Sequence, residues 1–249
     1  MIVVGTRDGL DGRRVVVTGA SSGIGEAVAR AAAAEGARVG VLARRADRLD
    51  ALAGEIGGHA AAADVTDVAA VGDAVDRLAG ALGGLDAVVA AAGTMHLGAV
   101  GETDPQRWRE VFDVNVHGLL ATARAALPHL GEGGSWVTIS SMSGRRVPSA
   151  AGGVYAASKH AAHAVDETLR REAGSRGVRV TTVAPGFVAT DLMAADVAED
   201  DVAAFRERMH AQGLAPEHVA AAVVHVLALP PEVCVVEYAL TSVAQLRGS

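Results

Sequence analysis

Short runs of β-branched residues alternate along the chain with longer, alanine-rich segments. Runs of this length are typical of buried strands when glycine or polar residues bound them. The first run, RVVVT, is nearly all apolar, as expected for a strand that is covered on both faces. The pattern predicts about seven strands, at Arg14–Thr18, Arg38–Leu42, His59–Ala63, Leu85–Ala91, Ser135–Ser140, Arg179–Ala184 and Val233–Ala239.

The segments between these runs have helical periodicity. A regular alternation of strand and helix indicates βαβ crossovers, and these build a parallel sheet with helices on both faces. We therefore predict an α/β fold with a doubly wound parallel sheet. No linker rich in proline, serine or charge divides the chain, so we expect a single domain over residues 1–249. The expected helices are Gly23–Glu35, Asp47–Ile56, Asp67–Ala79, Pro105–Leu130, Val154–Arg176 and Pro216–Leu229.

Composition narrows the range of partners. Half of the residues (50%) are apolar and only 3% are aromatic, which suits a close-packed core of small side chains. The 22 basic and 29 acidic residues give a net charge of −7 at pH 7. A negative surface repels nucleic acid and anionic lipid, so we expect neither as a partner. Abundant Ala, Gly, Arg and Val with few Lys indicate a GC-rich bacterial source.

The cysteine, histidine and terminal patterns exclude further classes of protein. Cys234 is the single cysteine, so no intrachain disulfide forms, and we expect it to be a small buried residue. The nine histidines lack a metal-binding spacing such as H-E-x-x-H, so we predict no metal site. Met1–Gly12 does not resemble a signal peptide, and no apolar stretch is long enough to span a membrane. We expect a cytoplasmic protein.

A glycine-rich segment, TGASSGIG, joins the first strand to the first helix at Thr18–Gly25. Ligands of open α/β sheets bind outside the carboxyl ends of the strands, and glycines there let the backbone approach a pyrophosphate. A plain strand-to-helix turn is the alternative, and the spacing G-x-x-x-G-x-G departs from the usual G-x-G-x-x-G fingerprint. The position at the first βα junction favours a dinucleotide site in a Rossmann-type fold.

The end of the second strand predicts which dinucleotide binds. An acidic residue at this position binds the ribose of NAD, whereas arginine accepts the 2′-phosphate of NADP. Here the strand ends in Ala43-Arg44-Arg45, and Asp47 comes late enough to start the next helix instead. We therefore predict NADP(H), with NAD(H) as the less favoured cofactor. The alternative is that Arg44 and Arg45 are ordinary solvated surface charges.

A tyrosine and a lysine four residues apart form the candidate catalytic pair. Tyr155 and Lys159 lie on one face of a predicted helix. A phenol has a pKa near 10, and a neighbouring ammonium lowers that pKa, so the pair is suited to general acid–base chemistry. Such a spacing taken alone is more often surface decoration, but together with the glycine loop it predicts an active site. Ser141 follows the fifth strand and is placed to hydrogen-bond the substrate oxygen.

These motifs together resemble the short-chain dehydrogenase/reductase family. The resemblance runs from about Leu10 to Gln245 and rests on Thr18-Gly19-x-x-x-Gly23-Ile24-Gly25, on Tyr155-x-x-x-Lys159, and on an upstream serine and asparagine. It implies an NADP(H)-dependent oxidoreductase that acts on the carbonyl or secondary alcohol of a small molecule, as a ketoreductase or alcohol dehydrogenase. A catalytically silent, cofactor-binding regulatory or scaffold protein is the alternative. The short C-terminal segment counts against a sugar-nucleotide epimerase or dehydratase.

The resemblance also assigns roles to single residues. It implies a catalytic tetrad of Asn115, Ser141, Tyr155 and Lys159, in which Asn115 supports a water-linked proton path through Lys159. Lys159 is also implied to hold the nicotinamide ribose. The full set of cofactor contacts implied by the family is Gly19, Ser21, Ser22, Gly23, Ile24, Gly25, Arg44, Arg45, Asp64, Val65, Ala91, Gly93, Tyr155, Lys159, Pro185, Gly186, Val188 and Thr190.

Two departures from the family pattern affect this prediction. The chain has Ala90-Ala91-Ala92-Gly93 where the family usually has Asn-Asn-Ala-Gly, a change expected to loosen the central sheet or shift the cofactor slightly. The spacing between Ser141 and Tyr155 is one residue longer than the commonest pattern. Ser143 therefore remains an alternative to Ser141, which we prefer because it stands nearer the strand end.

The sequence does not identify the substrate. By resemblance, the segment from about Thr190 to Gly213 forms a lid over it, and this lid includes Leu192, Met193, Phe205 and Met209. Five further residues flank the catalytic motifs and are candidates for the substrate pocket: Met95, His96, Ser143, Arg145 and Val154. The resemblance also implies a homo-oligomer, a dimer or tetramer, that pairs through the two long alanine-rich helices.

Overall fold

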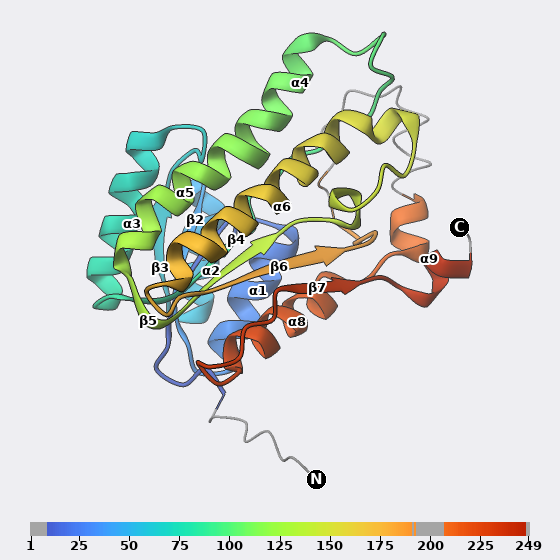
Figure 1. Ribbon diagram of the computed structural model, residues 1–249. Helices are drawn as coiled ribbons and strands as arrows, with labels where there is room; N and C mark the ends of the chain where they lie inside the picture. The colour runs from blue at the N-terminus through green and yellow to red at the C-terminus, as the bar shows by residue number, and fades with distance from the viewer. Residues whose placement is uncertain (1–8, 191, 193–206, 248–249) are drawn as a thin grey trace.

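Seven strands form one parallel sheet in a computed structural model, which describes residues 9–190, 192 and 207–247 (Figure 1). The strand order is β3-β2-β1-β4-β5-β6-β7, and every neighbouring pair is parallel. The predicted doubly wound α/β fold is confirmed. The strands are β1 Arg14–Thr18, β2 Arg38–Ala43, β3 His59–Ala62, β4 Leu85–Ala90, β5 Leu130–Ile139, β6 Arg179–Pro185 and β7 Glu237–Leu240.

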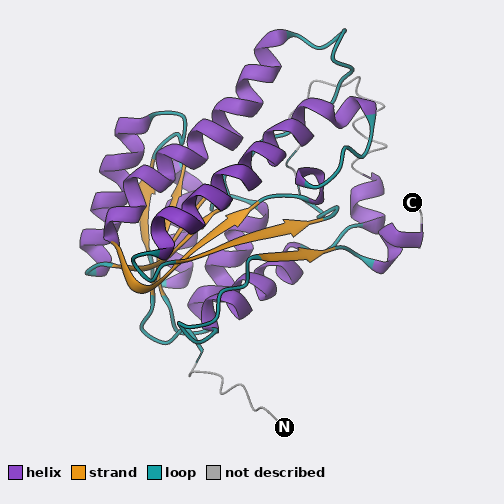
Figure 2. Ribbon diagram, viewed as in Figure 1, coloured by secondary structure: helices purple, strands orange, loops and turns teal. Residues whose placement is uncertain are grey.

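Helices cover both faces of this sheet (Figure 2). Helices α1, α2 and α8 pack on one face of the sheet, and α3, α5 and α6 pack on the other. Each group of three covers one apolar core. The interior strand β1 contributes to both cores because Val15 and Val17 point to one face and Val16 to the other. The helices are α1 Gly23–Ala34, α2 Ala46–Ile56, α3 Val68–Leu82, α4 Pro105–Phe112, α5 Gly118–Ala126, α6 Gly153–Gly174, α8 Pro216–Ala228 and α9 Val243–Arg247.

The strand order reverses next to β1. The chain builds outward from β1 to β3, and helix α3 then carries it back so that β4 pairs with the other side of β1. Neighbouring crossovers diverge at such a switch point and leave a crevice at the carboxyl ends of the strands. The glycine loop after β1 and residues 91–93 after β4 both lie at this crevice.

The segment predicted as one helix, Pro105–Leu130, is divided in the structure. A π-helical turn, Asp113–His117, separates α4 from α5, and a short 3₁₀ turn precedes β5. The π turn contains Asn115, whose side chain bonds the backbone of Thr94 instead of pointing to solvent. Single π turns of this kind are frequent at functional sites.

The C-terminal prediction was partly wrong. The last strand was expected at Val233–Ala239 but lies at Glu237–Leu240, and a short helix, α9, follows it. An apolar run can place a strand only to within a few residues, because pairing with β6 sets its bounds. Cys234, expected to be buried, is exposed, because it precedes the strand instead of lying within it.

Most of the predicted lid lies outside the described residues, including Met193 and Phe205. Residues 207–212 are helical, and Leu192 and Met209 pack near Tyr155 in a small apolar cluster. Over the part of the chain that is described, no helix is both long and apolar enough to cross a membrane.

Candidate active site

A cleft of about 1680 Å³ opens at the carboxyl ends of the strands. It extends from the glycine loop and the end of β2, past the ends of β1 and β4, to the start of α6. Every residue that the sequence assigned to cofactor contact lines this cleft, and so do Ser141, Tyr155 and Lys159. Of the four predicted catalytic residues, only Asn115 lies outside it.

The glycine loop is shaped for close backbone approach. Gly19 has φ +67°, and a Cβ there would lie 2.6 Å from the backbone nitrogen of Ala92. A Cβ on Gly25 would lie 2.5 Å from the carbonyl oxygen of Gly19. Side chains are thus excluded at both positions. The loop lies against the turn after β4, and the first residues of α1 line the cleft, an arrangement that suits a pyrophosphate.

Arg45 turns toward the glycine loop, whereas Arg44 is mostly exposed. Its guanidinium donates hydrogen bonds to Ser21 Oγ at 2.9 Å and to Ser22 Oγ at 2.6 Å, both in the glycine loop. The Arg44 side chain is 74% exposed and stands 3.8 Å from Asp64. Arg48 also lines this end of the cleft. A strand end with three arginines and two serine hydroxyls offers cations and donors for an additional phosphate.

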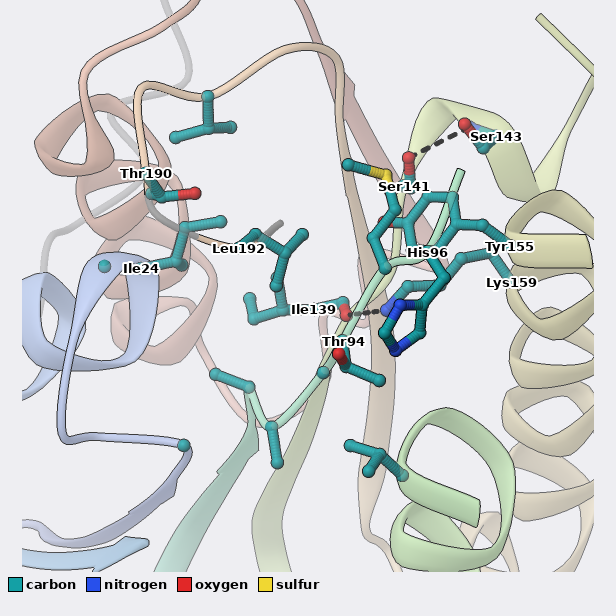
Figure 3. Close-up of a pocket in the computed structure, with 18 of the residues that line it drawn as sticks. Ile24, Thr94, His96, Ile139, Ser141, Ser143, Tyr155, Lys159, Thr190 and Leu192 are labelled. Carbon is teal, nitrogen blue, oxygen red and sulfur yellow. Dashed lines mark hydrogen bonds between the residues drawn. The ribbon is translucent and has the colours of Figure 1, made fainter. Parts of the chain in front are cut away.

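Tyr155 and Lys159 lie one turn apart on α6 and are both buried, at 7% and 5% exposure. The Lys159 amine lies 5.8 Å from the centre of the Tyr155 ring and donates a 3.2 Å hydrogen bond to the carbonyl of Ile139, at the end of β5 (Figure 3). This bond fixes the lysine between the helix and the sheet edge.

Burial shifts the pKa of both side chains in the direction that favours the uncharged form. It raises the pKa of Tyr155 to about 12, partly opposed by a hydrogen bond with Ser141. It lowers the pKa of Lys159 to about 8. The lowering of the Tyr155 pKa that the sequence predicted is therefore outweighed by burial in this structure. With a pKa of about 8, the Lys159 amine can both hold and release a proton near neutral pH.

Lys159 is also the only lysine in the sequence, among 22 basic residues. Arginine supplies every other cationic side chain, although the two residues differ in size and only lysine loses its proton near neutral pH. This single lysine was a signal available in the sequence. It indicates that this position requires the size or the titration of a lysine, which arginine lacks.

The two candidate serines are not equivalent. Ser141 is 9% exposed and caps the short helix Met142–Gly144, where its Oγ accepts a hydrogen bond from the backbone N–H of Ser143 at 3.0 Å. Ser141 is also the residue whose side chain lowers the pKa of Tyr155 through a hydrogen bond. Figure 3 shows the Ser143 side chain further from the ring. The geometry favours Ser141.

Asn115 acts from outside the cleft. Its side chain bonds both backbone groups of Thr94 at 2.9 Å and donates to Ser158 Oγ at 3.0 Å. It thereby ties the turn after β4 to α6, one residue before Lys159. Asn115 and Lys159 also line a small cavity of about 10 Å³, close to the minimum that holds one water molecule.

The alanines that replace the family's asparagines do not disrupt the sheet. Ala90 pairs in register with Thr18 on one side and Thr138 on the other. Thr18, the neighbour of Ala90 in the sheet, has a buried hydroxyl without a hydrogen-bond partner among the described residues. Thr18, Ala90 and Ala92 line the same small cavity as Lys159. Of the two replaced positions, Ala90 lines this cavity and Ala91 lines the main cleft.

The open end of the cleft is lined by residues from several segments. Met95, His96 and Ser143 line it as predicted, together with Leu192 and Met209, whereas Arg145 and Val154 do not. His96 lies buried with its Nε2 3.2 Å from Glu110 on α4. The sequence did not predict this pair, because the two residues are distant along the chain. The described residues contain no group of His, Cys, Asp and Glu side chains placed to hold a metal ion.

Comparison with known proteins agrees with this architecture. A family model described as short chain dehydrogenase matches residues 13–201. An uncharacterized oxidoreductase of Mycobacterium tuberculosis is 47% identical over 193 residues, covering 77% of this chain and 74% of that protein.

Two solved structures have nearly the same fold. A short chain dehydrogenase of Burkholderia cenocepacia in complex with NADP is 37% identical, with a TM-score of 0.82, covering 95% of this chain and 99% of that one. An alcohol dehydrogenase of the archaeon Thermococcus sibiricus, complexed with 5-hydroxy-NADP, is 32% identical, with a TM-score of 0.81, covering 94% and 97%. The chain belongs to the short-chain dehydrogenase/reductase family and is an oxidoreductase.

Proposed function

We propose that the protein is an NADP(H)-dependent ketoreductase or alcohol dehydrogenase that acts on a small carbonyl compound or secondary alcohol. The observation that carries this proposal is the buried Tyr155–Lys159 pair, which shares one cleft with the glycine loop and with Ser141. A cofactor-binding protein without catalysis has no need to bury a phenol beside a lysine. The similar alcohol dehydrogenase complexed with an NADP derivative supports the same activity.

The side chains supply the proton half of the reaction. The nicotinamide, when bound, donates a hydride to the carbonyl carbon or accepts one from the alcohol. Tyr155 is protonated at neutral pH because burial raises its pKa to about 12, so it can donate its proton to the carbonyl oxygen as the alcohol forms. Ser141 is placed to hold that oxygen by a hydrogen bond. Lys159 stabilises the phenolate left behind, and the phenolate can accept the alcohol proton in the reverse direction.

Arg45 is the proposed determinant of cofactor choice. It already hydrogen-bonds both serines of the glycine loop, and Arg44 and Arg48 line the same end of the cleft. A phosphate placed there would receive charge-assisted hydrogen bonds, each worth about 1.5–3 kcal/mol. One such bond corresponds to roughly a 10- to 100-fold preference for NADPH over NADH. The NADP complex of the similar Burkholderia cenocepacia dehydrogenase supports this assignment.

Titration of the protein with NADPH and NADH, followed by nicotinamide fluorescence, tests the cofactor assignment. R45A is expected to weaken NADPH binding by roughly 10- to 100-fold and to leave NADH binding nearly unchanged. R38A is the matched control, because Arg38 begins the same strand at its opposite end and is exposed. Equal loss of both cofactors in R45A would contradict the 2′-phosphate role.

Y155F tests the catalytic assignment. With NADPH and a panel of ketones, turnover is expected to fall by at least ~10²–10⁴-fold because the proton donor is lost, while NADPH binding stays near normal. Y238F, a change at the only other tyrosine, is the control and should retain activity. Wild-type turnover in Y155F would overturn the mechanism. NADPH binding without turnover of any ketone or alcohol by the wild type would favour the catalytically silent alternative.

We also propose that the protein is a homo-oligomer, a dimer or a tetramer. Exposed apolar side chains support this, among them Leu120 on α5 and Val236 beside the edge strand β7, at 44% and 54% exposure. Sedimentation velocity measures the state directly. A single monomeric species at micromolar concentration would contradict the proposal.

A further inference from the structure

The core next to the catalytic pair contains a carboxylate that the proposed mechanism does not use. Asp166 lies on α6 and is 0% exposed. Its two carboxylate oxygens accept hydrogen bonds of 2.6 Å each from Thr138 Oγ1 and Thr182 Oγ1. These partners are hydroxyls instead of a cation. A carboxylate buried in this way is costly to a fold, so its presence requires an explanation.

The hydrogen bonds around Asp166 are those that an ionised carboxylate can accept. Trp136 Nε1 donates to Thr138 Oγ1 at 2.8 Å, and an indole nitrogen can only donate. The hydroxyl of Thr138 accepts that bond and donates its own proton to Asp166 Oδ1. The length of both bonds, 2.6 Å, is that of hydroxyls donating to a charged acceptor. Burial raises the pKa of Asp166 to about 6, which still leaves it ionised at pH 7 to 8.

Asp166 is joined to Lys159 by both the helix and the sheet. The two residues are seven positions apart on α6, which places them two turns apart on one face, about 10 Å along the axis. Thr138, which Asp166 holds, is directly followed by Ile139, whose carbonyl accepts the hydrogen bond from Lys159. Thr138 also lines the small cavity beside Lys159.

Asp166 also connects two strands to the helix. Thr138 and Thr182 are paired in register on the adjacent strands β5 and β6. One carboxylate therefore fixes α6 to both strands, close to where β5 leads into Ser141. Its negative charge raises the pKa of Lys159, against the effect of burial.

We infer that Asp166 is a positioning residue for the catalytic pair: held by two threonine hydroxyls, it anchors α6 to β5 and β6 and places a negative charge two helical turns from the Lys159 ammonium. Its effect on the Lys159 amine is a property of the folded chain. Its importance for turnover rests on the proposed function.

The other charged groups around α6 are distributed differently. On α6 itself, Arg170 interacts electrostatically with Asp166, and His163, whose pKa burial lowers, interacts with Lys159. On the elements packed against α6, six charged side chains are at least 29% exposed: Arg107 and Glu110 of α4, Asp113 and His117 of the π turn, and Arg145 and Glu237, which interact with His163. Solvent screens exposed charges of this kind more than the buried carboxylate. Arg179, at the start of β6, is buried instead, and its guanidinium donates to Ser135 Oγ and to the carbonyl of Leu229.

Because Lys159 is the only lysine, its titration can be followed without assignment. We would label the full-length protein with ¹³C-lysine and record the shift of the side-chain CH₂ next to the amine against pH, with and without NADP⁺. D166N removes the charge and keeps the shape. The expected result is a Lys159 titration moved to lower pH by roughly one unit, the size expected for charges about 10 Å apart in a partly screened interior.

Two further variants separate this role from simple stabilisation. D86N is the matched control: it is the same change at a carboxylate that binds Arg14 at the opposite end of the strands, and the Lys159 titration should not move. T182V removes one hydroxyl donor and keeps the carboxyl, so it should shift the titration in the same direction by a smaller amount. T182V also serves as the test if D166N does not fold.

Turnover connects the inference to catalysis. The pH dependence of ketone reduction should move to lower pH in D166N by the same amount as the amine titration. Unchanged Lys159 titration in D166N and T182V would overturn the inference, even if both variants were less stable. A shifted titration together with an active Y155F would leave the role of Asp166 standing and refute the proposed function.

Discussion

The buried lysine makes a prediction about stability that does not depend on any substrate. Burial lowers the pKa of Lys159 from 10.5 to about 8, so the folded chain binds fewer protons than the unfolded chain between these values. At about 1.4 kcal/mol per pKa unit, burying the ammonium costs about 3 kcal/mol below pH 8. The cost disappears as the pH rises through 10.5, so stability should increase with pH in this window.

K159M should therefore be more stable than the wild type at pH 7. The variant also loses the hydrogen bond to Ile139, which costs it about 1 kcal/mol of stability. The net gain is therefore about 2 kcal/mol, or roughly 5 °C in Tm for a chain of this size. Urea unfolding at pH 7 and pH 10, followed by tryptophan fluorescence, measures both free energies. The two proteins should converge toward pH 10, the highest pH used, because the raised pKa of Tyr155 makes stability fall between pH 10 and about 12.

K159R is the control for this reasoning. It keeps the charge at every accessible pH, so it should show neither the gain at pH 7 nor the rise above pH 8. Two results would show that burying the Lys159 ammonium does not destabilise the fold. One is a wild-type stability that stays flat between pH 8 and 10, and the other is a K159M variant no more stable than the wild type at pH 7.

Three further substitutions test other parts of the structure. G19A should abolish NADPH binding in a fluorescence titration, because its Cβ would lie 2.6 Å from the backbone of Ala92; binding at wild-type affinity would disprove the close approach. N115A should lower turnover more than it raises the Kd for NADPH, because the Thr94 turn is released while the cleft remains; an equal effect on both would argue against a positioning role. D86N should lower the free energy of unfolding by no more than about 1 kcal/mol at pH 7. Because Arg14 holds the pKa of Asp86 below 3.8, the unfolding free energies of D86N and the wild type, measured in urea, should converge as the pH falls below that value. A difference that persists at pH 2 would contradict the last prediction.

The fold could be predicted from sequence because its signals are local. Continuous valine runs mark strands buried on both faces, and the glycine loop marks the first crossover. The π turn at Asn115 could not be predicted in this way, because helical periodicity continues through it and only the contact with Thr94, 21 residues away, shows its purpose. The last strand was misplaced for a similar reason, since pairing with β6 sets its bounds.

The candidate site shows the same division. Spacing was enough to associate Tyr155 with Lys159, which are one helical turn apart. The choice between Arg44 and Arg45 depends on side-chain direction, and adjacent residues at a strand end point in different directions. Asp166 gave no signal at all, because a single aspartate in a helix is ordinarily solvated, and only the approach of two neighbouring strands makes it a core residue.

The presence of one lysine also gives the protein a single cutting site for a lysine-specific protease. The susceptible bond, Lys159–His160, lies inside α6, and the lysine is only 5% exposed, so cleavage requires the catalytic helix to open. The rate at which the intact chain disappears therefore reports how readily that helix opens. Any cofactor or substrate that binds the folded site should slow it, and this gives a ligand screen that needs neither a label nor a measurable reaction.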